Sequence, residues 1–299
     1  MSELTTLQKQ LSSICELKYN EPMSNHTSFR IGGAAEVMAF PKNTDELADI
    51  LKQADALGIK PRILGAGTNV LAPDEPLEGI VVCLKHLDGM EVLSSSRIGV
   101  MAGVTMTRAA LFAAKNGLSG LEFAHGIPGT VGGGVFMNAG AYGGEISQVL
   151  ESALVMQSDG KLYRLTQEQM EYTYRHSILE ITEDIVVYAV FNLEKTREVL
   201  VKLKMQDLME KRSKSQPLDL PSAGSAFKRP QGGYAAALID EAGLKGYQVG
   251  GAAISTKHAG FAVNLGGATA QDVKTLLNDV SNIVYEKSGI RLEPEIRIW

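Results

Sequence analysis

The segment Gly126-Ile-Pro-Gly-Thr-Val-Gly-Gly133, followed by Met137-Asn-Ala-Gly-Ala-Tyr-Gly143, is the densest glycine region of the chain. Glycine is abundant overall, with 31 among 299 residues, and it gathers in a few loops. Such loops let a ligand approach the backbone closely, where N–H groups can hold it. The segment lacks the Gly-Lys-Ser/Thr ending of an ATP-type phosphate loop, so that kind of site is excluded.

A second glycine loop, Gly65-Ala-Gly-Thr-Asn69, follows an expected strand over 62–64. It begins like a dinucleotide-binding fingerprint, but the third glycine is missing and Pro76 would interrupt the helix that must follow. The standard NAD-binding fold is therefore not expected. Either loop alone is compatible with a simple tight turn. Two such loops in one domain, full of free backbone N–H groups, favour a bound anion such as a pyrophosphate, held without a helix or a lysine.

Around these loops, the spacing of apolar residues predicts short strands and amphipathic helices. The expected strands cover 36–40, 62–64, 80–84, 90–93, 98–102, 153–157, 162–165, 185–193, 261–265 and 295–299. The expected helices cover 44–57 with Thr44 as the N-cap, 107–115, 196–213, 234–241, and a strongly amphipathic segment between Thr269 and Gly289. Strands separated by short turns predict an antiparallel or mixed sheet. Pro217 and Pro221 indicate a domain boundary nearby.

The composition is that of an ordinary folded chain without a strong charge. Hydrophobic residues make up 44% and charged residues 21%, and the formal net charge is −5. A mildly acidic chain is not expected to bind nucleic acid, which requires concentrated positive charge. At about 150 residues per domain, the length predicts two domains.

Cys15 and Cys83 are the only cysteines, too few for a disulfide framework or a four-cysteine zinc site. No cluster of histidine, cysteine and aspartate has metal-ligand spacing, so no metal is expected. A reducing, cytoplasmic compartment fits this cysteine usage. The N-terminus does not read as a signal peptide, and no run of about 18 apolar residues predicts a membrane span.

Six segments occur in the order of one known family, from about residue 20 to the end of the chain. Besides the glycine region Gly126–Gly143, they are Asn25-His-Thr-Ser-Phe-Arg30, Gly65-Ala-Gly-Thr-Asn-Val-Leu71, Tyr174-Arg-His-Ser177, Gly224-Ser-Ala-Phe-Lys228 and Pro294-Glu-Ile-Arg297. The chain resembles the UDP-N-acetylenolpyruvoylglucosamine reductases, the MurB family of peptidoglycan-precursor enzymes. The segment after Tyr174 lacks a longer inserted loop, so the chain is similar to the shorter subtype.

This resemblance implies an α+β fold with a two-lobed FAD-binding domain of the PCMH or vanillyl-alcohol-oxidase type. The implied organisation is an N-terminal helical segment over 1–19, the FAD-binding domain over 20–205 and an α+β substrate-binding domain over 206–299. The C-terminal tail is expected to return to the flavin.

The resemblance also implies the reaction of a UDP-N-acetylmuramate dehydrogenase. NADPH would reduce FAD that is bound tightly but not covalently. The reduced flavin would then convert the enolpyruvyl ether of UDP-N-acetylglucosamine enolpyruvate to UDP-N-acetylmuramate. This is a step of peptidoglycan synthesis, and hence of cell-wall formation, cell shape and cell division. Because both small molecules must reach the same flavin edge, they are expected to bind in turn.

The residues that the resemblance assigns to FAD lie mainly in the two glycine loops. They are Gly65, Ala66, Gly67, Thr68, Asn69, Val70, Leu71, Gly126, Ile127, Pro128, Gly129, Thr130, Gly132, Gly133, Asn138, Ala139, Gly140 and Arg212.

Three residues are expected to carry the chemistry because they match the family's motifs. Arg175 would grip the substrate carboxylate with a guanidinium that stays charged. Ser225 would donate the proton, and Glu295 would donate a hydrogen bond to the enolate. Outside these motifs, the same residues would be a surface arginine, a turn serine and a solvated edge glutamate.

Lys228, Arg229 and His258 are expected to face the substrate. Some relatives carry asparagine at the position of Arg229, so no specific contact is transferred to it. His258 stands at a position that faces the substrate in those relatives that carry glutamine, and its alternative is a hydrogen-bonded structural histidine.

Three other functions stay open. An FAD enzyme acting on another substrate would bind flavin without responding to the enolpyruvyl sugar nucleotide. The second is a non-catalytic flavin- or nucleotide-binding regulator. The third is an NAD dehydrogenase, which a colourless protein would favour.

Overall fold

The computed structural model describes residues 3–299, and the chain divides into two compact units. The first unit contains the chain up to Tyr19, together with Val37–Ala66 and Gly79–Lys211. The second unit contains Asn20–Glu36, Gly67–Glu78 and Arg212–Trp299. Both units mix helices and strands, so the expected α+β class is confirmed.

The two units interleave along the chain, whereas the sequence predicted continuous domains with a boundary between residues 205 and 206. Two segments from the N-terminal third belong to the second unit because hydrogen bonds hold them to C-terminal residues. The Asp74 carboxylate accepts a hydrogen bond from the Ala270 backbone N–H at 2.7 Å. The Asn264 side-chain amide donates to the Phe29 carbonyl at 3.0 Å. Contacts between residues so far apart leave no local signal in the sequence.

A five-stranded antiparallel sheet is the largest sheet of the first unit, in the order β12-β11-β13-β7-β6. Its strands are β6 (Met90–Val92), β7 (Arg97–Met101), β11 (Leu150–Met156), β12 (Leu162–Thr166) and β13 (Ile185–Asn192). Buried residues of this sheet share one core with the helices α3 (Met106–Lys115), α4 (Val131–Phe136) and α6 (Glu198–Ser215). The expectation of an antiparallel or mixed sheet is confirmed.

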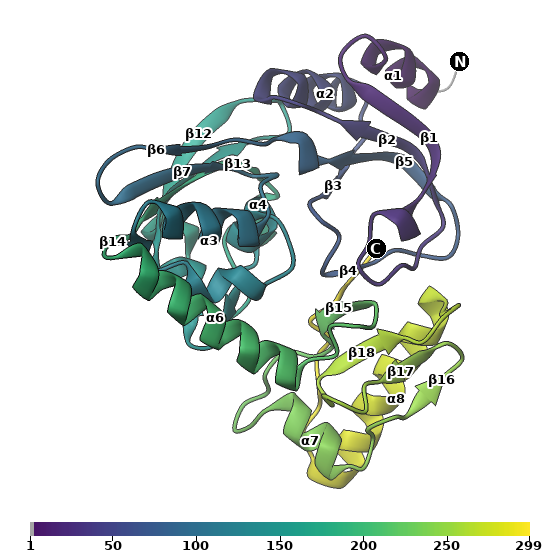
Figure 1. Cartoon of the computed structure of the whole chain (residues 1–299). Helices are drawn as coiled ribbons and strands as arrows, with labels where there is room; N and C mark the ends of the chain where they lie inside the picture. Colours follow the sequence, from purple (N-terminus) through teal and green to yellow (C-terminus); the bar gives the residue numbers. More distant parts are fainter. Residues whose placement is uncertain (1–2) are drawn as a thin grey trace. The chain divides into compact units, whose positions relative to one another are not determined.

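A four-stranded sheet has the order β1-β2-β5-β3. Its strands are β1 (Glu16–Pro22), β2 (Ala34–Phe40), β3 (Arg62–Leu64) and β5 (Leu77–Cys83). The helices α1 (Glu3–Leu11) and α2 (Thr44–Ala56) lie side by side and share a core with β2 and β5 (Figure 1).

The predicted helix α2 is confirmed, but its predicted cap is wrong by one residue. Asn43 is the N-cap, because its side chain accepts a hydrogen bond from the Glu46 backbone N–H at 2.9 Å. Thr44 is the first residue inside the helix. Asparagine and threonine both cap helices well, so their order in the sequence does not decide between them.

The remaining elements of the first unit are short. They are β8 (Leu118–Ser119), β9 (Gly140–Ala141), β10 (Gly144–Glu145), β14 (Glu194–Lys195), α5 (Leu179–Thr182), and 3-10 helices at Leu84–His86, Glu122–Gly126, Ile146–Gln148 and Glu168–Met170. The densest glycine region therefore contains the one-and-a-half-turn helix α4 and a small β9–β10 hairpin rather than turns alone.

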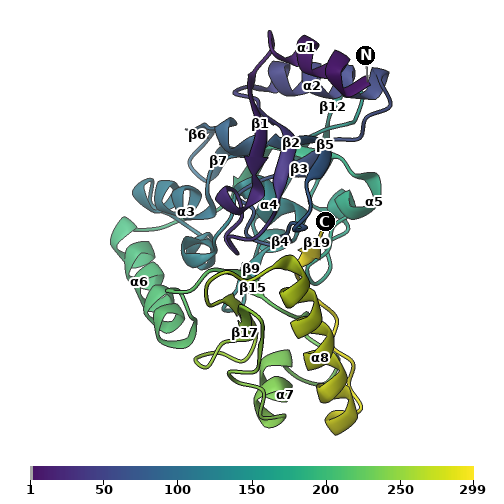
Figure 2. The same cartoon turned by 90° about the vertical axis from the view of Figure 1, so that its right-hand side faces the viewer.

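The second unit is built on the antiparallel sheet β15-β18-β17-β16. Its strands are β15 (Ser222–Ser225), β16 (Gln248–Val249), β17 (Ala252–Ile254) and β18 (Phe261–Asn264). It also holds a 3-10 helix at Met23–Asn25 and the helices α7 (Ala235–Glu241) and α8 (Ala270–Ser288). Figure 2 shows α8 running beside this sheet, against which its apolar face is buried.

Helix α8 is confirmed with both of its predicted ends. Thr269 and Asp272 form a capping box, in which each side chain accepts a hydrogen bond at 3.0 Å from the other's backbone N–H. Gly289 ends the helix with a φ of +72°, a conformation that glycine adopts readily. No helix within residues 3–299 is both long and apolar enough to cross a membrane.

The C-terminal strand β19 (Arg297–Ile298) pairs in parallel with β4 (Val70–Leu71) (Figure 2). The Arg297 backbone N–H donates to the Asn69 carbonyl at 3.0 Å, and the Trp299 N–H donates to the Leu71 carbonyl at 3.1 Å. Leu71 is fully buried, so losing its partner would leave a carbonyl poorly solvated. The predicted strand near the C-terminus is confirmed, and its partner is the loop that follows Gly65.

Trp299→Pro removes the backbone N–H that bonds Leu71, whereas Trp299→Ala removes the same side chain and keeps the N–H. We expect the proline variant to be about 1–2 kcal/mol less stable than the alanine variant in urea unfolding of the second unit. Equal stability of the two variants would show that this hydrogen bond contributes nothing.

Candidate active site

The two glycine loops meet within the first unit, at Gly65 and Thr130. A β-carbon placed on Gly65 would lie 2.5 Å from the Thr130 hydroxyl oxygen, so no larger residue fits there without a shift. Thr130 is buried and caps α4, since its hydroxyl accepts a hydrogen bond from the Gly133 N–H at 3.4 Å. The Gly65 carbonyl accepts a hydrogen bond from the Cys83 thiol at 3.8 Å. Burial raises the pKa of that thiol, which keeps it protonated as the donor.

The backbone of the 126–134 segment is bonded to the protein more extensively than the sequence suggested. The Val131 N–H donates to the Val104 carbonyl at 2.8 Å, and the Gly132 N–H donates to the Ala102 carbonyl at 2.9 Å. The Gly134 N–H is taken up inside α4. The expectation that these N–H groups are free for an anion is therefore wrong. The competing partner is the chain around Ala102, which is remote in sequence.

His125 stands directly before this segment and leaves one buried nitrogen without a partner. Its Nδ1 has no hydrogen-bond partner among residues 3–299. Burial lowers the pKa of His125, so the imidazole is neutral at pH 7. A buried polar atom without a partner is rare in a folded protein, and a bound group next to the loop would supply one.

Arg175 occupies the tip of a tight turn in the first unit. Thr173 and His176 bond each other through both backbone groups, at 3.2 and 3.3 Å, and Arg175 between them has a φ of +56°. Its guanidinium donates to the carbonyls of Asn138 and Gly140, at 3.4 and 3.0 Å. A positive φ in a residue other than glycine is unusual, and such residues gather at functional sites. Arg175 is thus hydrogen-bonded to Asn138 and Gly140, two residues that the sequence predicted to bind the cofactor.

The Asn138 side chain fixes this junction. Asn138 is buried and has a φ of +45°. Its side-chain Nδ2 donates to the Thr173 carbonyl at 3.1 Å, and its side-chain Oδ1 accepts from the Ser147 backbone N–H at 2.9 Å. The Ser177 hydroxyl adds a bond to the Phe136 carbonyl at 2.7 Å. The sequence did not predict this supporting role, because it depends on contacts between distant segments.

The later part of the 65–71 loop belongs to the second unit. Gly67 has a φ of +62°, and a β-carbon there would lie 2.0 Å from the His26 carbonyl oxygen, so the position requires glycine. The Ser28 N–H donates to the Gly67 carbonyl at 3.1 Å, and the Ser28 hydroxyl donates to the Ser222 carbonyl at 2.6 Å. The motif that begins at Asn25 therefore connects this loop to strand β15.

Ser225 and Glu295 come from segments 70 residues apart, yet the second unit brings their backbones together. Ser225 is exposed at the end of β15, opposite Phe261 of β18. The Glu295 N–H donates to the carbonyl of Ala226, the residue after Ser225, at 2.9 Å. Glu295 is half-buried, whereas the neighbouring Ile296 is buried in the core.

Three other polar residues predicted for the site, Lys228, Arg229 and Arg212, differ in their exposure and in their partners. Lys228 lies 3.8 Å from the exposed Glu293 carboxylate, a pair that contributes little to stability. Arg229 is exposed, with its guanidinium 4.4 Å from the centre of the Tyr234 ring. Arg212, in the last turn of α6, is buried.

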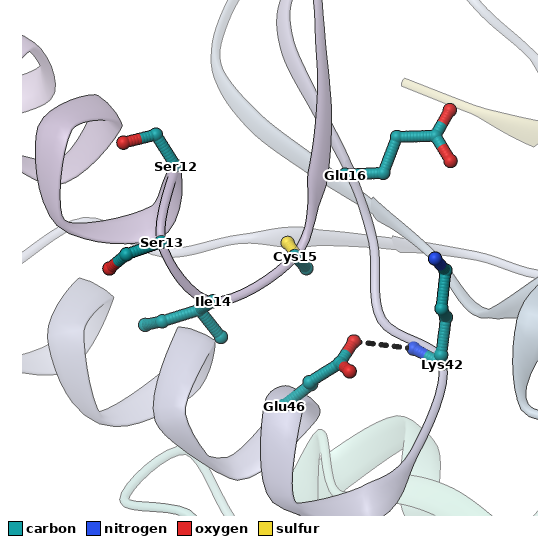
Figure 3. A pocket seen from close by; sticks show the side chains of 7 residues that line it. All are labelled: Ser12, Ser13, Ile14, Cys15, Glu16, Lys42 and Glu46. Carbon is teal, nitrogen blue, oxygen red and sulfur yellow. Dashed lines mark hydrogen bonds between the residues drawn. The ribbon is translucent and has the colours of Figure 1, made fainter.

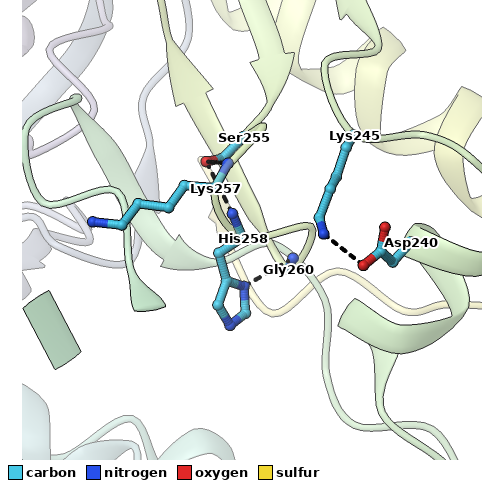
Figure 4. A network of polar contacts seen from close by, with 6 residues as sticks. All are labelled: Asp240, Lys245, Ser255, Lys257, His258 and Gly260. Atoms are coloured by element: carbon cyan, nitrogen blue, oxygen red, sulfur yellow. Dashed lines mark hydrogen bonds and ion pairs between the residues drawn. The ribbon is translucent and has the colours of Figure 1, made fainter. Parts of the chain in front are cut away.

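His258 belongs to a compact loop between β17 and β18 (Figure 4). Its Nδ1 accepts a hydrogen bond from the Gly260 N–H at 3.1 Å. Its ring meets the Phe261 ring edge to face, with the ring centres 5.0 Å apart. Burial lowers the pKa of His258, so the neutral imidazole can act as this acceptor.

A separate surface pocket lies where α1 ends and α2 begins (Figure 3). It is lined by Ser12, Ser13, Ile14, Cys15, Glu16, Lys42 and Glu46. Burial raises the pKa of the Cys15 thiol, and a protonated thiol is a poor nucleophile. No residue expected to bind cofactor or substrate lines this pocket, so we do not assign the active site to it. The described part of the chain also contains no cluster of histidine, cysteine and carboxylate residues that could hold a metal ion.

Comparisons with known proteins show the family to which the chain belongs. Residues 216–299 match the profile of the UDP-N-acetylenolpyruvoylglucosamine reductase C-terminal domain, and residues 35–166 match that of an FAD-binding domain. The reductase of Caldanaerobacter subterraneus subsp. tengcongensis is 44% identical over 97% of this chain and 96% of its own length. This chain belongs to the UDP-N-acetylenolpyruvoylglucosamine reductase family.

Further relatives support the assignment to this reductase family. The reductase of Caldicellulosiruptor saccharolyticus is 46% identical over 94% of this chain and 91% of its own length. The crystal structure of UDP-N-acetylenolpyruvylglucosamine reductase (MurB) from Thermus caldophilus matches with a TM-score of 0.81 and 34% identity, over 95% of this chain and 98% of that one. A berberine-bridge-like protein of Physcomitrella patens, 13% identical with a TM-score of 0.50 over 63% of this chain and 44% of that one, shares the fold alone.

FAD is therefore the cofactor of this reductase-family chain. The FAD-binding match covers Gly65, Thr130 and the Asn138–Gly140 segment. The close fit of Gly65 against Thr130 and the unpartnered Nδ1 of His125 are consistent with a bound group at these loops. Sequence reasoning missed Cys83 and gave His125 no role, because only the folded structure shows the thiol bonded to Gly65 and the buried nitrogen without a partner.

Gly65→Ala tests the contact between the loops. The added methyl group would crowd the Thr130 hydroxyl, and overpacking costs about 1–3 kcal/mol. We expect FAD affinity, measured by titrating the apoprotein and following flavin fluorescence, to fall by roughly tenfold or more.

A second change at Thr130 provides the matched control. Gly65→Ala with Thr130→Ala removes the crowded atom, leaving the nearest Thr130 carbon 3.7 Å away, and should recover part of the affinity. Gly65→Ala with Thr130→Val keeps an atom in the hydroxyl's place and should not. Equal affinities in the two double variants would contradict the steric explanation.

Proposed function

We propose that this chain reduces the enolpyruvyl ether of UDP-N-acetylglucosamine enolpyruvate to UDP-N-acetylmuramate, with NADPH as the reductant and bound FAD as the carrier. The observation that carries the proposal is the hydrogen bond from Glu295 to Ala226, which sets Glu295 beside Ser225 in the second unit. The names of the relatives and the C-terminal match over residues 216–299 support the same substrate class.

The residues proposed to hold FAD are those of the two glycine loops. They are Gly65, Ala66, Gly67, Thr68, Asn69, Val70, Leu71, Gly126, Ile127, Pro128, Gly129, Thr130, Gly132, Gly133, Asn138, Ala139 and Gly140, together with Arg212, which lies outside the loops. Held there, FAD would supply the hydride-transfer chemistry that links NADPH to the substrate. The N–H groups of Val131 and Gly132 already donate to protein carbonyls. Gly132 is therefore proposed to contribute to the FAD site by its small size rather than as a hydrogen-bond donor.

Arg175 is proposed to bind the substrate carboxylate. Its guanidinium carries five N–H donors and stays charged at any physiological pH. The bonds to the Asn138 and Gly140 carbonyls fix the plane of the group. A fixed cation stabilises negative charge that spreads into the carboxylate during reduction, without reorganising at that moment.

Ser225 and Glu295 are proposed to handle the proton. A serine hydroxyl is a very weak acid, so its donation depends on placement beside a strongly basic carbanion. Gly224 has a φ of +79°, the pairing of β15 with β18 is irregular between Ser222 and Ser225, and Ser225 is exposed at the end of the strand. Glu295, in its protonated form, donates a hydrogen bond to the developing enolate oxygen. Lys228 and Arg229 stay predictions as groups that face the substrate, whereas His258 keeps the two alternatives of a substrate-facing group and a hydrogen-bonded structural residue.

Anaerobic stopped-flow absorbance tests the reaction directly. The holoprotein is first bleached with NADPH and then mixed with UDP-N-acetylglucosamine enolpyruvate. We expect the visible absorbance of oxidised flavin to return rapidly. If it bleaches but stays bleached, the chain is an FAD oxidoreductase acting on another substrate, and the proposed function is wrong.

Ser225→Ala separates the two halves of this reaction. Bleaching by NADPH should keep its normal rate, because Ser225 has no part in it. Reoxidation by the enolpyruvyl substrate should slow by about 10²–10⁴-fold, the usual contribution of a positioned proton donor. Reoxidation at the wild-type rate would rule out Ser225 as the donor.

Glu295→Gln and Glu295→Ala compare two ways of losing the carboxyl group. Glutamine keeps a hydrogen-bond donor of similar length, whereas alanine removes it. We expect alanine to slow reoxidation by about 10²–10³-fold and glutamine to slow it less. Equal losses in the same stopped-flow assay would argue against the hydrogen-bonding role.

A further inference from the structure

The imidazole of His258 begins a chain of hydrogen bonds that ends at Glu295. The Gly260 N–H donates to His258 Nδ1 at 3.1 Å (Figure 4). The Gly260 carbonyl in turn accepts from the Ala226 N–H at 2.8 Å, and the Ala226 carbonyl accepts from the Glu295 N–H at 2.9 Å. All of these residues lie in the second unit.

We propose that His258 is a positioning residue, which holds Ser225 and Glu295 in register through Gly260 and Ala226, and that it does not contact the substrate. The roles of Ser225 and Glu295 in this inference rest on the proposed function. The N–H of Ala226 belongs to the peptide group that joins it to Ser225, so its bond to Gly260 fixes the backbone of Ser225 directly. The same residue's carbonyl fixes the backbone of Glu295.

The ring of His258 is held firmly enough to set this register. The Ser255 hydroxyl accepts hydrogen bonds from the backbone N–H groups of Lys257 and His258, at 3.2 and 3.3 Å. The Phe261 N–H closes the loop on the His258 carbonyl at 3.1 Å. The His258 ring packs edge to face on Phe261, and Phe261 is the strand partner of Ser225. The packing of the His258 ring on Phe261 and the hydrogen bond from Ala226 to Gly260 therefore both act at the position where β15 pairs with β18 beside Ser225.

Glycine at position 260 suits this series of hydrogen bonds because the His258 ring approaches its backbone closely. A β-carbon there would lie 3.0–3.1 Å from the His258 ring and from Ala236, tighter than most side-chain contacts. A glycine at this position lets the imidazole approach the backbone. Since a backbone N–H can only donate, Nδ1 is the unprotonated nitrogen and the proton resides on Nε2.

Substitution by asparagine or glutamine distinguishes a positioning role from a substrate contact. The asparagine oxygen is bonded to Cγ, as Nδ1 is in histidine, so His258→Asn can still accept from Gly260. The glutamine amide extends one atom further, where Nε2 lies in histidine. His258→Gln therefore keeps a donor for a substrate but loses the short-range acceptor.

We expect His258→Asn to reduce the enolpyruvyl substrate at a kcat within about threefold of wild type, and His258→Gln to lose about 10- to 100-fold in kcat with little change in KM. Displacement of a catalytic group by a fraction of an ångström to an ångström produces losses of this size. Bleaching by NADPH should be unchanged in both variants. A substrate contact predicts the reverse order, with glutamine the better replacement and the loss in KM.

Hydrogen exchange provides a readout that does not depend on activity. The amides of Ala226 and Glu295 should exchange faster in His258→Gln than in His258→Asn or wild type, because the chain of hydrogen bonds has lost its first member. Equal exchange in all three proteins, or better function with glutamine, would overturn the inference. Failure of the wild type itself to reduce the substrate would instead reject the proposed function, and the exchange rates would still decide the positioning role.

Lys245→Gln serves as the matched control. Lys245 lies in the same polar network and pairs with Asp240 at 2.6 Å, but it takes no part in the chain to Glu295 (Figure 4). The pair is substantially exposed and should contribute little. We expect wild-type kinetics and exchange from this variant. Loss of exchange protection at Ala226 and Glu295 in Lys245→Gln would mean that the register does not depend on the His258 acceptor, and would overturn the inference.

Discussion

The pairing of residues 293–299 is the constraint on which the second unit's site depends. This segment is hydrogen-bonded to two different parts of the second unit. The Glu295 N–H donates to the Ala226 carbonyl, and the Arg297 N–H donates to the Asn69 carbonyl. Ile296 lies between them and is buried in the core. Burial of Ile296 in that core makes a shift in the pairing of this segment costly. This segment thereby holds Ala226, the residue after Ser225, and the Asn69–Leu71 part of the loop through its own backbone N–H groups.

The first unit uses its own backbone in a similar way. Its two glycine loops meet at Gly65 and Thr130, and its Arg175 rests on the carbonyls of Asn138 and Gly140. Many backbone groups of these loops are already bonded to the protein, so hydrogen bonds hold the loops in place without a ligand. Loops held in this way suit a cofactor enzyme, because the protein's task is to place a reactive group and its charges rather than to perform the redox chemistry itself.

Much of the local structure could be predicted because its causes are local. Helix α8 has its capping residues and its closing glycine within reach of its own turns, and the structure confirms both ends. Predictions were less accurate where two neighbouring residues are chemically alike, as at Asn43 and Thr44. The free N–H groups expected around Gly132 do not exist, because a segment near Ala102 competes for them.

The sequence by itself determined the family, the likeness of its motifs to an FAD enzyme, and the identity of the residues proposed for chemistry, since these depend on residue types in a fixed order. Only the tertiary structure decided that Glu295 bonds the residue after Ser225, that Arg175 takes up a left-handed turn on Asn138, and that His258 leads through Gly260 to Glu295. These facts depend on hydrogen bonds between segments remote in sequence, and the donors and acceptors become partners only when burial of the core brings the strands together.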